Sequence, residues 1–331
     1  MSLLSNPNEK PPGIAVIGTG RMGPGIALSF AGGGCPVLLV GRGKPQLERA
    51  QAAIQEALDL MVNNGLMEAE AAEATTARLR MSTDLAEISE AGIVVEATPE
   101  VLASKRKLLA EYEAIARSDA ILASNTSGLP ITQIAAGMRA PQRMVGMKFV
   151  IPAHLIPLVE VVKGRATDPE IMERACTVLR QIGKRPVKVM HDVPGFLNNR
   201  VQQAMRREAI NLVARGIASA EDVDAAVQWG FGFRLLGAGT LESADLVGLE
   251  QILRIHSYIL PDLDPPSDPS PLLKQLIAEG KTGSGAGQGF LAWDAAREQA
   301  ATRRMETVLV ELLKLLQRVE ETSAATRDKT K

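Results

Sequence analysis

The chain has 331 residues, of which 46% are hydrophobic, and this is enough material for two domains with sizeable cores. Its 37 Lys and Arg residues nearly balance its 38 Asp and Glu residues, and no basic block stands out, which argues against nucleic acid or an anionic membrane as a partner. The two cysteines, Cys35 and Cys176, each lie in an apolar context, so we expect no disulfide framework and a reducing, cytoplasmic setting.

The two ends of the chain are polar. Residues 1–12 are rich in proline and lack the pattern of a signal peptide, so we expect a flexible leader there. Residues 321–331 are polar and predict a disordered tail. Between them, no run approaches the roughly 18 apolar residues that a membrane span requires.

The first half alternates short β-branched runs with longer amphipathic stretches. Strands are expected over 14–18, 36–41, 93–97, 120–125, 144–150, 157–162 and 185–192. Helices are expected over 24–33, 44–62, 68–78 and 101–116. This spacing predicts an α/β domain over 13–192, Rossmann-type and doubly wound, with a mainly parallel sheet and helices on both faces.

After Pro194 the periodicity becomes helical. Helices are expected over 195–215, 219–228, 241–260, 268–279 and 295–320. One of them opens with a good capping signature, because Ser219 can cap it and Glu221 and Asp222 fall in its first turn. We therefore predict an all-helical C-terminal domain over 193–320.

A G-x-G-x-x-G pattern, formed by Gly18, Gly20 and Gly23, follows the first expected strand and opens the first helix. The first glycine permits a tight turn, the second lets the backbone approach a pyrophosphate, and the third allows close helix–strand packing. The helix N-terminus then presents free N–H groups to the phosphates. Arg21 and Met22, which lie between the last two glycines, join them as candidate dinucleotide-binding residues.

The end of the second strand leaves the choice of dinucleotide open. An acidic residue is expected there to hold the ribose hydroxyls of NAD, but the chain has Gly41, followed by Arg42. An arginine next to the position where this acidic residue is missing favours binding of the 2′-phosphate of NADP. Alternatively, Arg42 is a solvated loop residue and NAD binds less tightly. Both NAD and NADP are therefore candidate cofactors.

Several longer motifs, together with the glycine pattern, resemble the 3-hydroxyacyl-CoA dehydrogenase family. They are VVEATPEVLASK (94–105), ASNTSGLPIT (123–132), VGMKF…PLVEVV (145–162), DVPGFLNNR (192–200), GTLESADLVGLE (239–250) and GQGFLAWD (287–294). The resemblance implies a nicotinamide-dependent oxidation of a 3-hydroxyacyl thioester to the 3-ketoacyl form. It also implies that the helical domain serves dimerisation, so we expect a homodimer.

The resemblance assigns roles to five further residues by position. Glu100 and Lys105 resemble family residues near the cofactor and the substrate-side phosphates. Ser127 resembles the serine that hydrogen-bonds the substrate oxygen, and Asn199 resembles an active-site asparagine. Glu160 resembles the carboxylate that orients the catalytic histidine of the family.

That histidine belongs at position 148, in a G-x-H-F-x-N-P pattern, where this chain has Lys148 and, three residues later, Ile151 in place of the asparagine. Hydride transfer needs a group that accepts or donates the hydroxyl proton. A free lysine has a pKa of about 10.4, which burial lowers and a neighbouring carboxylate raises. Two interpretations follow: Lys148 replaces the histidine as acid/base, or it forms a buried ion pair with Glu160 in a homologue with little or no turnover.

The substrate is expected to be a small molecule, either an acyl-CoA or a free hydroxy acid. The helix after the second strand has Ala57 and Asn64 where the family's thioester implies a small hydroxyl and a lysine. The sequence PAHLIPLVEV also occurs in relatives that resemble gulonate dehydrogenase and act on free hydroxy acids. Arg234 could clamp the carboxylate of such an acid, or it is a surface residue or forms an intersubunit salt bridge. His154, in the same sequence, either shapes the turn between the two strands or faces the entrance of the substrate site.

The histidines and cysteines show no metal-ligand spacing, so no metal is expected.

Overall fold

The computed structural model describes residues 11–235, 237–263 and 268–328. These residues form two compact units. The first contains the chain up to Arg200 and the residues from Glu306 onward, and the second contains Val201–Met305.

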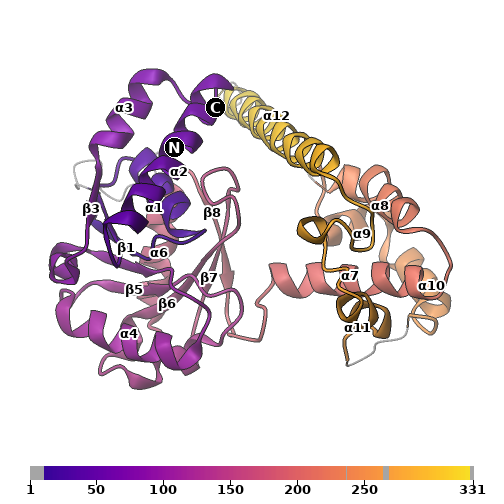
Figure 1. Ribbon diagram of the computed structural model, residues 1–331, viewed down its shortest axis with the longest axis horizontal. Coiled ribbons are helices and arrows are strands. Elements are labelled where there is room, and N and C mark those ends of the chain that lie inside the picture. Colours follow the sequence, from indigo (N-terminus) through magenta and orange to yellow (C-terminus); the bar gives the residue numbers. More distant parts are fainter. Residues whose placement is uncertain (1–10, 236, 264–267, 329–331) are drawn as a thin grey trace. The chain divides into compact units, whose positions relative to one another are not determined.

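An eight-stranded sheet forms the centre of the first unit (Figure 1). Its strands are β1 (Ile14–Ile17), β2 (Val37–Val40), β3 (Leu79–Ser82), β4 (Ile93–Glu96), β5 (Ile121–Ser124), β6 (Met144–Phe149), β7 (Leu158–Val162) and β8 (Arg185–Val189). Their order across the sheet is β3-β2-β1-β4-β5-β6-β7-β8, and only the β6–β7 pair is antiparallel. The predicted mainly parallel, Rossmann-type sheet is therefore confirmed.

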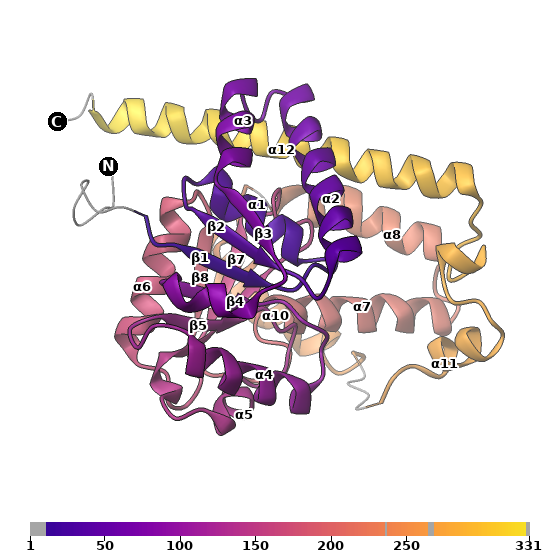
Figure 2. The ribbon, with the colours of Figure 1, turned by 60° about the vertical axis from the view of Figure 1, so that its left-hand side comes forward.

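Helices cover both faces of this sheet (Figure 2). They are α1 (Gly23–Gly32), α2 (Lys44–Asn63), α3 (Ala69–Ala77), α4 (Leu102–Ile115), α5 (Ile131–Ile134) and α6 (Pro169–Gln181), with short 3-10 helices η1 (Leu85–Glu90), η2 (Ala135–Gly137) and η3 (Pro141–Arg143). One apolar core joins the strands to α1, α2 and α6, and a second joins them to α4 and α5. Because both faces are covered, the central strands are almost wholly buried and read as unbroken apolar runs.

The sequence did not predict the strand β3, the helix α6, or the short elements α5, η1, η2 and η3 of this unit. The strand β3 lies at the sheet edge and is only half buried, so its sequence LRMS carries no apolar run. The helix α6 begins with a clear signal, because the Asp168 side chain caps it by accepting a hydrogen bond from the N–H of Glu170 (2.9 Å) and Pro169 opens its first turn.

The second unit is helical, as expected. After α7 (Asn198–Ala214), which begins in the first unit, come α8 (Ala220–Trp229), η4 (Gly232–Arg234), α9 (Thr240–Val247), α10 (Leu249–Ile259), α11 (Pro271–Ala278) and η5 (Ser284–Ala286). The single helix predicted over 241–260 was wrong: it breaks at Gly248, whose φ of 97° is incompatible with a continuous right-handed helix. Ser219 caps α8, as predicted.

The last helix, α12 (Ala295–Asp328), corrects two expectations about the end of the chain. The tail expected to be disordered is helical up to Asp328, because its alanine, glutamate and arginine residues favour a helix that is already nucleated. The residues from Glu306 onward also belong to the first unit and not to the helical domain. Residues 1–10 of the expected leader and 329–331 of the tail lie outside the described residues.

Candidate active site

Most of the predicted site residues lie at the carboxyl edge of the sheet. The register pairs Ile17 with Glu96, Glu96 with Ser124, and Ser124 with Gly146, so β1, β4, β5 and β6 end close to one another. The glycine loop and the segments that carry Glu100, Ser127 and Lys148 therefore share this edge. In open α/β sheets, ligands bind at the carboxyl ends of the strands, at the point where the strand order reverses, which here is between β1 and β4.

The glycine loop fits a dinucleotide pyrophosphate. A Cβ at Gly23 would lie 1.7 Å from the carbonyl oxygen of Gly18, so helix and loop pack too closely for any side chain there. A Cβ at Gly20, by contrast, would meet nothing within 4 Å, which leaves open space above the loop. No side chain caps α1, so its first amides are available to a phosphate. These residues are suited to hold NAD or NADP.

The end of β2 has no carboxylate for the ribose. At Gly41 a Cβ would lie 2.7 Å from Leu47 Cδ2 and 2.9 Å from Thr19 Cγ2, so an aspartate would not fit without movement. Arg42 is exposed and makes no ion pair within the described part of the chain.

Lys148 and Glu160 are register partners on the antiparallel strands β6 and β7. Their side chains are only 7% and 1% exposed, and the distance between Lys148 Nζ and Glu160 Oε2 is 2.6 Å. The other carboxylate oxygen, Oε1, accepts the N–H groups of Leu197 (2.8 Å) and Asn198 (2.9 Å). A turn with positive φ at Gly195 (78°) precedes these amides and brings the chain over the strands. Glu160 is thus fixed from both sides.

Asn199 connects this ion pair to Ser127. Lys148 Nζ donates a hydrogen bond to Asn199 Oδ1 (3.2 Å), and Asn199 Nδ2 donates one to the carbonyl oxygen of Ser127 (2.7 Å). The structure therefore brings the four residues expected to be catalytic, Lys148, Glu160, Ser127 and Asn199, into one hydrogen-bonded group.

Glu100 extends the group on the other side of Ser127. Its Oε1 accepts from the N–H (2.7 Å) and hydroxyl (2.9 Å) of Ser127 and from the hydroxyl of Thr126 (2.6 Å). Desolvation raises the pKa of Glu100, but these hydrogen bonds and the charge of Lys105 outweigh it and hold that pKa below its usual value. Glu100 therefore carries its negative charge at neutral pH.

Lys105 lies deeper than the sequence suggests. Its ammonium is fully buried and bonds both oxygens of Glu96 (2.7 and 2.9 Å), while Glu100 Oε2 lies 3.5 Å away. It is therefore enclosed by protein and not presented to a phosphate from solvent. Sequence reasoning missed Glu96, which also accepts from the Ser124 hydroxyl. The signal was its charge at the end of the apolar run IVVE.

A cavity of about 400 Å³ adjoins the glycine loop. Its walls come from the loop, from α1 and α2, and from residues 151–154 of the β6–β7 connection. Ala57 lines it, whereas Asn64 ends α2 and donates to the carbonyl of Leu60 (2.8 Å). His154 also lines it; burial, aided by the charge of Lys184, lowers the pKa of His154 to about 4, so its imidazole is neutral at pH 7.

A second residue that the sequence did not reveal, Lys184, holds the β6–β7 connection. Its buried ammonium donates to the carbonyl oxygens of Ala153 (2.6 Å) and Ile156 (3.1 Å). Ser29, on α1, also donates to the carbonyl of Ala153 (3.0 Å). The wall of the cavity is therefore fixed to the helix that follows the glycine loop.

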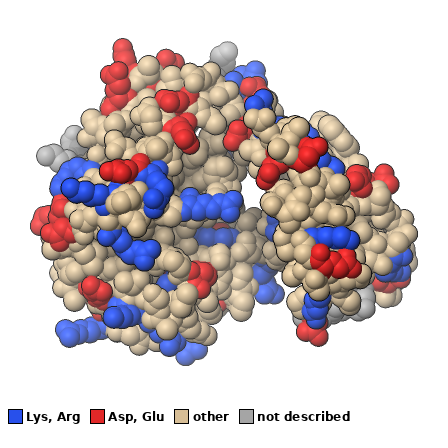
Figure 3. Space-filling model, viewed as in Figure 1, with Lys and Arg blue, Asp and Glu red and all other residues tan. Residues whose placement is uncertain are grey.

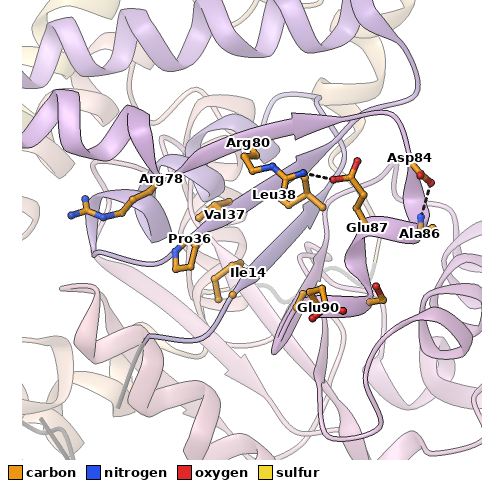
Figure 4. A pocket seen from close by; sticks show the side chains of 13 residues that line it. Ile14, Pro36, Val37, Leu38, Arg78, Arg80, Asp84, Ala86, Glu87 and Glu90 are labelled. Carbon is orange, nitrogen blue, oxygen red and sulfur yellow. Dashed lines mark hydrogen bonds and ion pairs between the residues drawn. The ribbon is translucent and has the colours of Figure 1, made fainter. Parts of the chain in front are cut away.

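A larger hollow, of about 470 Å³, lies at the amino ends of β1 and β2, away from this edge (Figure 4). Two of its charged groups have partners within the hollow: Arg80 bonds Glu87, and Asp84 caps the following turn by accepting from the N–H of Ala86. Basic and acidic side chains are interspersed on the face drawn in Figure 3. Arg234 is exposed in the second unit.

Within the described ranges, no helix is long and apolar enough to cross a membrane. In the same ranges, no group of three or more histidine, cysteine, aspartate and glutamate side chains is placed to hold a metal ion.

Comparison with known proteins agrees with this architecture. The family description "3-hydroxyacyl-CoA dehydrogenase, NAD binding domain" matches residues 13–193, and the family's C-terminal domain matches residues 195–293. A 5-formyl-3-hydroxy-2-methylpyridine 4-carboxylate 5-dehydrogenase of Mesorhizobium japonicum is 33% identical over 305 residues, which are 92% of this chain and 98% of that protein. A probable 3-hydroxybutyryl-CoA dehydrogenase of Deinococcus radiodurans is 34% identical over 278 residues, which are 84% of this chain and 98% of that protein.

A crystal structure of 5-formyl-3-hydroxy-2-methylpyridine 4-carboxylic acid 5-dehydrogenase, an NAD+-dependent dismutase, is similar to this fold with a TM-score of 0.86. The sequence identity is 33%, and the similarity covers 92% of this chain and 98% of that one. The chain belongs to the 3-hydroxyacyl-CoA dehydrogenase family and is an oxidoreductase of that type, with NAD or NADP as its cofactor.

Proposed function

We propose that the chain transfers hydride between NAD(P) and a 3-hydroxyacyl or 3-ketoacyl compound, with Lys148 as the acid/base in place of the family histidine. One observation carries the proposal: the Lys148 ammonium is held by Glu160 at 2.6 Å and by Asn199 at 3.2 Å, at the sheet edge that also carries the glycine loop. A lysine left over in a decayed site would need only its counter-ion. Here it also bonds Asn199, which in turn bonds Ser127.

A nicotinamide dinucleotide held by the glycine loop would supply or accept the hydride. In the reductive direction, the carbonyl carbon gains that hydride, and the Lys148 ammonium donates a proton to the carbonyl oxygen. In the oxidative direction, the neutral amine takes the hydroxyl proton. Glu160 keeps two backbone N–H donors whichever form Lys148 adopts, so its carboxylate stays satisfied during the transfer.

Two substrate forms are compatible with this chemistry. The first is a 3-hydroxyacyl-CoA thioester of the 3-hydroxybutyryl-CoA type, to which the relative from Deinococcus radiodurans points. The second is a free acid, favoured by the relative from Mesorhizobium japonicum, whose name specifies a pyridine carboxylate, and by Ala57 on α2 and Asn64 at the C-cap of that helix. Neither of these two side chains can neutralise a CoA phosphate.

The role of Lys148 is tested with three variants. We expect Lys148→Ala to lower kcat at least about 100-fold, because positioned acid/base groups contribute factors of this order. We expect Lys148→His, which restores the family residue, to keep measurable turnover. Turnover is followed by NADH or NADPH absorbance with acetoacetyl-CoA and with acetoacetate.

The third variant controls for stability. Removing the lysine alone leaves Glu160 buried without its counter-ion, which costs about 3–5 kcal/mol in comparable pairs. The double variant Lys148→Met, Glu160→Gln removes both charges, so we expect it to be folded and inactive. Wild-type turnover in Lys148→Ala would rule out a catalytic role for Lys148 and leave a cofactor-binding homologue as the alternative.

We also infer that the chain forms a homodimer through its second unit. Among the described residues between Val201 and Met305, only Val223 is buried. Large apolar side chains of this unit are exposed instead, with Leu241 at 82%, Trp229 at 75% and Leu253 at 70%. Helices with such faces require a partner surface, and a second copy of the same unit offers matching ones.

A further inference from the structure

The cavity beside the glycine loop has an apolar floor widened by small side chains. Ala50, Ala53 and Ala57 line it from α2, at spacings of three and four residues that place them on one helix face. Leu28 contributes from α1, and Pro152 from the β6–β7 connection. The volume of about 400 Å³ lies in the range of small-molecule sites. The floor therefore suits the carbon skeleton of a small ligand.

Two arginines line the same cavity from different elements. Arg21 belongs to the glycine loop and Arg49 to α2. Neither has a hydrogen-bond or ion-pair partner among the described residues, and no aspartate or glutamate lines the cavity. Guanidinium groups bind carboxylates through two parallel hydrogen bonds. The two guanidinium groups are therefore the charged side chains that the cavity offers to an anion.

His154 gives the cavity a neutral polar group. Its imidazole has no hydrogen-bond partner among the described residues, so one ring nitrogen can donate to a ligand and the other can accept. The backbone beside it is rigid, because Lys184 and Ser29 both hold the carbonyl of Ala153. A ligand hydroxyl would meet a fixed partner here.

We propose that this cavity binds the substrate as a free organic acid, with its carboxylate on Arg21 and Arg49 and a hydroxyl or ring nitrogen on His154. The proposal rests on the dehydrogenase function proposed above and selects the free acid over the CoA thioester. A carboxylate held by Arg21 stays next to the loop that binds the dinucleotide. The apolar floor then takes the remaining carbon atoms of a compact acid.

The test is calorimetric titration of the enzyme saturated with NADH or NADPH, whichever binds more tightly. The probes are 3-hydroxyhexanoate, its uncharged amide, and 3-hydroxyhexanoyl-CoA. Because cofactor and probe are both reduced, no reaction occurs and binding is measured alone. We expect the acid to bind at least about tenfold more tightly than the amide, as a charge-assisted hydrogen bond requires.

The variant Arg49→Gln should remove this preference by weakening the acid about tenfold and leaving the amide unchanged. Lys44→Gln is the matched control, because it removes a cation from the same helix outside the cavity lining; it should bind the acid as the wild type does. Dinucleotide affinity should be the same in both variants. This control separates a local contact from a change in net charge.

Equal binding of acid and amide, or no binding of the acid, would overturn the proposal. The proposal would also fail if the CoA thioester bound more tightly than the acid and Arg49→Gln lowered the affinity for the thioester only. The arginines would then bind the phosphates of CoA. Oxidation of the three probes by NAD+ and NADP+ tests the dehydrogenase function separately. An intact acid preference without any oxidation would support the carboxylate site and refute the dehydrogenase function.

Discussion

Three buried lysines in the first unit show how surroundings decide what a cation can do. Lys105 and Lys148 each face a carboxylate, Glu96 and Glu160 respectively, so their charge is compensated. Lys184 has carbonyl oxygens as its hydrogen-bond partners. Desolvation accordingly lowers the pKa of Lys184 to about 8. Lys184 is therefore sensitive to mildly alkaline pH.

The lowered pKa of Lys184 predicts that the difference in the free energy of unfolding between the wild type and a variant without this lysine depends on pH. The pKa of Lys184 is lower in the folded state (about 8) than its ordinary value of 10.5, so the unfolded chain binds more protons between these values. Stability should therefore rise with pH across this window, relative to the variant Lys184→Met, which does not titrate there. Between pH 8 and 10 we expect the wild type to gain about 2 kcal/mol over the variant.

The measurement is urea unfolding of both proteins at several pH values in that range. Lys184→Arg serves as the control, because it keeps the charge at every pH tested and should show no such gain. A constant difference between wild type and Lys184→Met would mean that the pKa of Lys184 is the same in the folded and unfolded states.

The residues of the site differ in how far sequence could reveal them. Lys148 and Glu160 interrupt apolar runs, and Ser127 and Asn199 lie in long motifs, so all four could be named. Glu96 carried a similar signal, a charge at the end of an apolar run, and was missed. Lys184 could not be named, because its partners are carbonyl oxygens 28 and 31 residues away in the chain. The pairing of strands brings such groups together, and no local pattern records it.

The glycine loop and α1 act as one element, and two of its glycines have opposite roles. Gly23 is a packing residue, because its Cα lies against the carbonyl of Gly18. Gly20 borders open space and has no packing role in the free protein. Substitution at the two positions therefore separates folding from cofactor binding.

We expect Gly23→Ala to destabilise the protein by about 3 kcal/mol, since overpacking of a tight contact costs this much and the clash is with backbone. Gly20→Ala should leave the free protein within about 0.5 kcal/mol of wild type. It should nevertheless weaken NADH binding at least about tenfold, because the added methyl group occupies space next to the expected pyrophosphate. Urea unfolding without cofactor and NADH fluorescence titration measure the two effects. Unchanged NADH affinity in Gly20→Ala would show that the loop does not hold the pyrophosphate.

At the level of elements, the sequence predicted the buried strands better than the boundaries. Strands that are covered on both faces consist of apolar runs, which can be recognised in the sequence. The strand β3 lies at the sheet edge, pairs with one strand only and is partly exposed, so it needs no such run. The break at Gly248 was missed because the apolar periodicity continues through it, and only the backbone conformation there ends the helix. Extension of α12 was missed because polar composition predicts exposure and does not exclude a helix.

At the scale of the whole molecule, the two units differ in how much apolar surface they bury. The sheet unit has two apolar cores with many fully buried side chains. The helical unit, among its described residues, buries only Val223. A unit of about 100 residues normally excludes a far larger share of its apolar surface from water. The helical unit is therefore expected to complete its core by association.

This association gives the last prediction. Light scattering should report the mass of two chains of 35.3 kDa each at micromolar concentration. Leu253→Glu places a charge on an exposed apolar position of α10, which should lower the mass toward one chain and reduce thermal stability, because burial of a leucine contributes about 1.5–3 kcal/mol. Gln251→Glu adds the same charge at a neighbouring polar position that already accepts from Arg254, so it should remain dimeric. A wild-type chain that is monomeric and unfolds cooperatively at every concentration would contradict the dimer, since the exposed faces of the helical unit would then be stable in water.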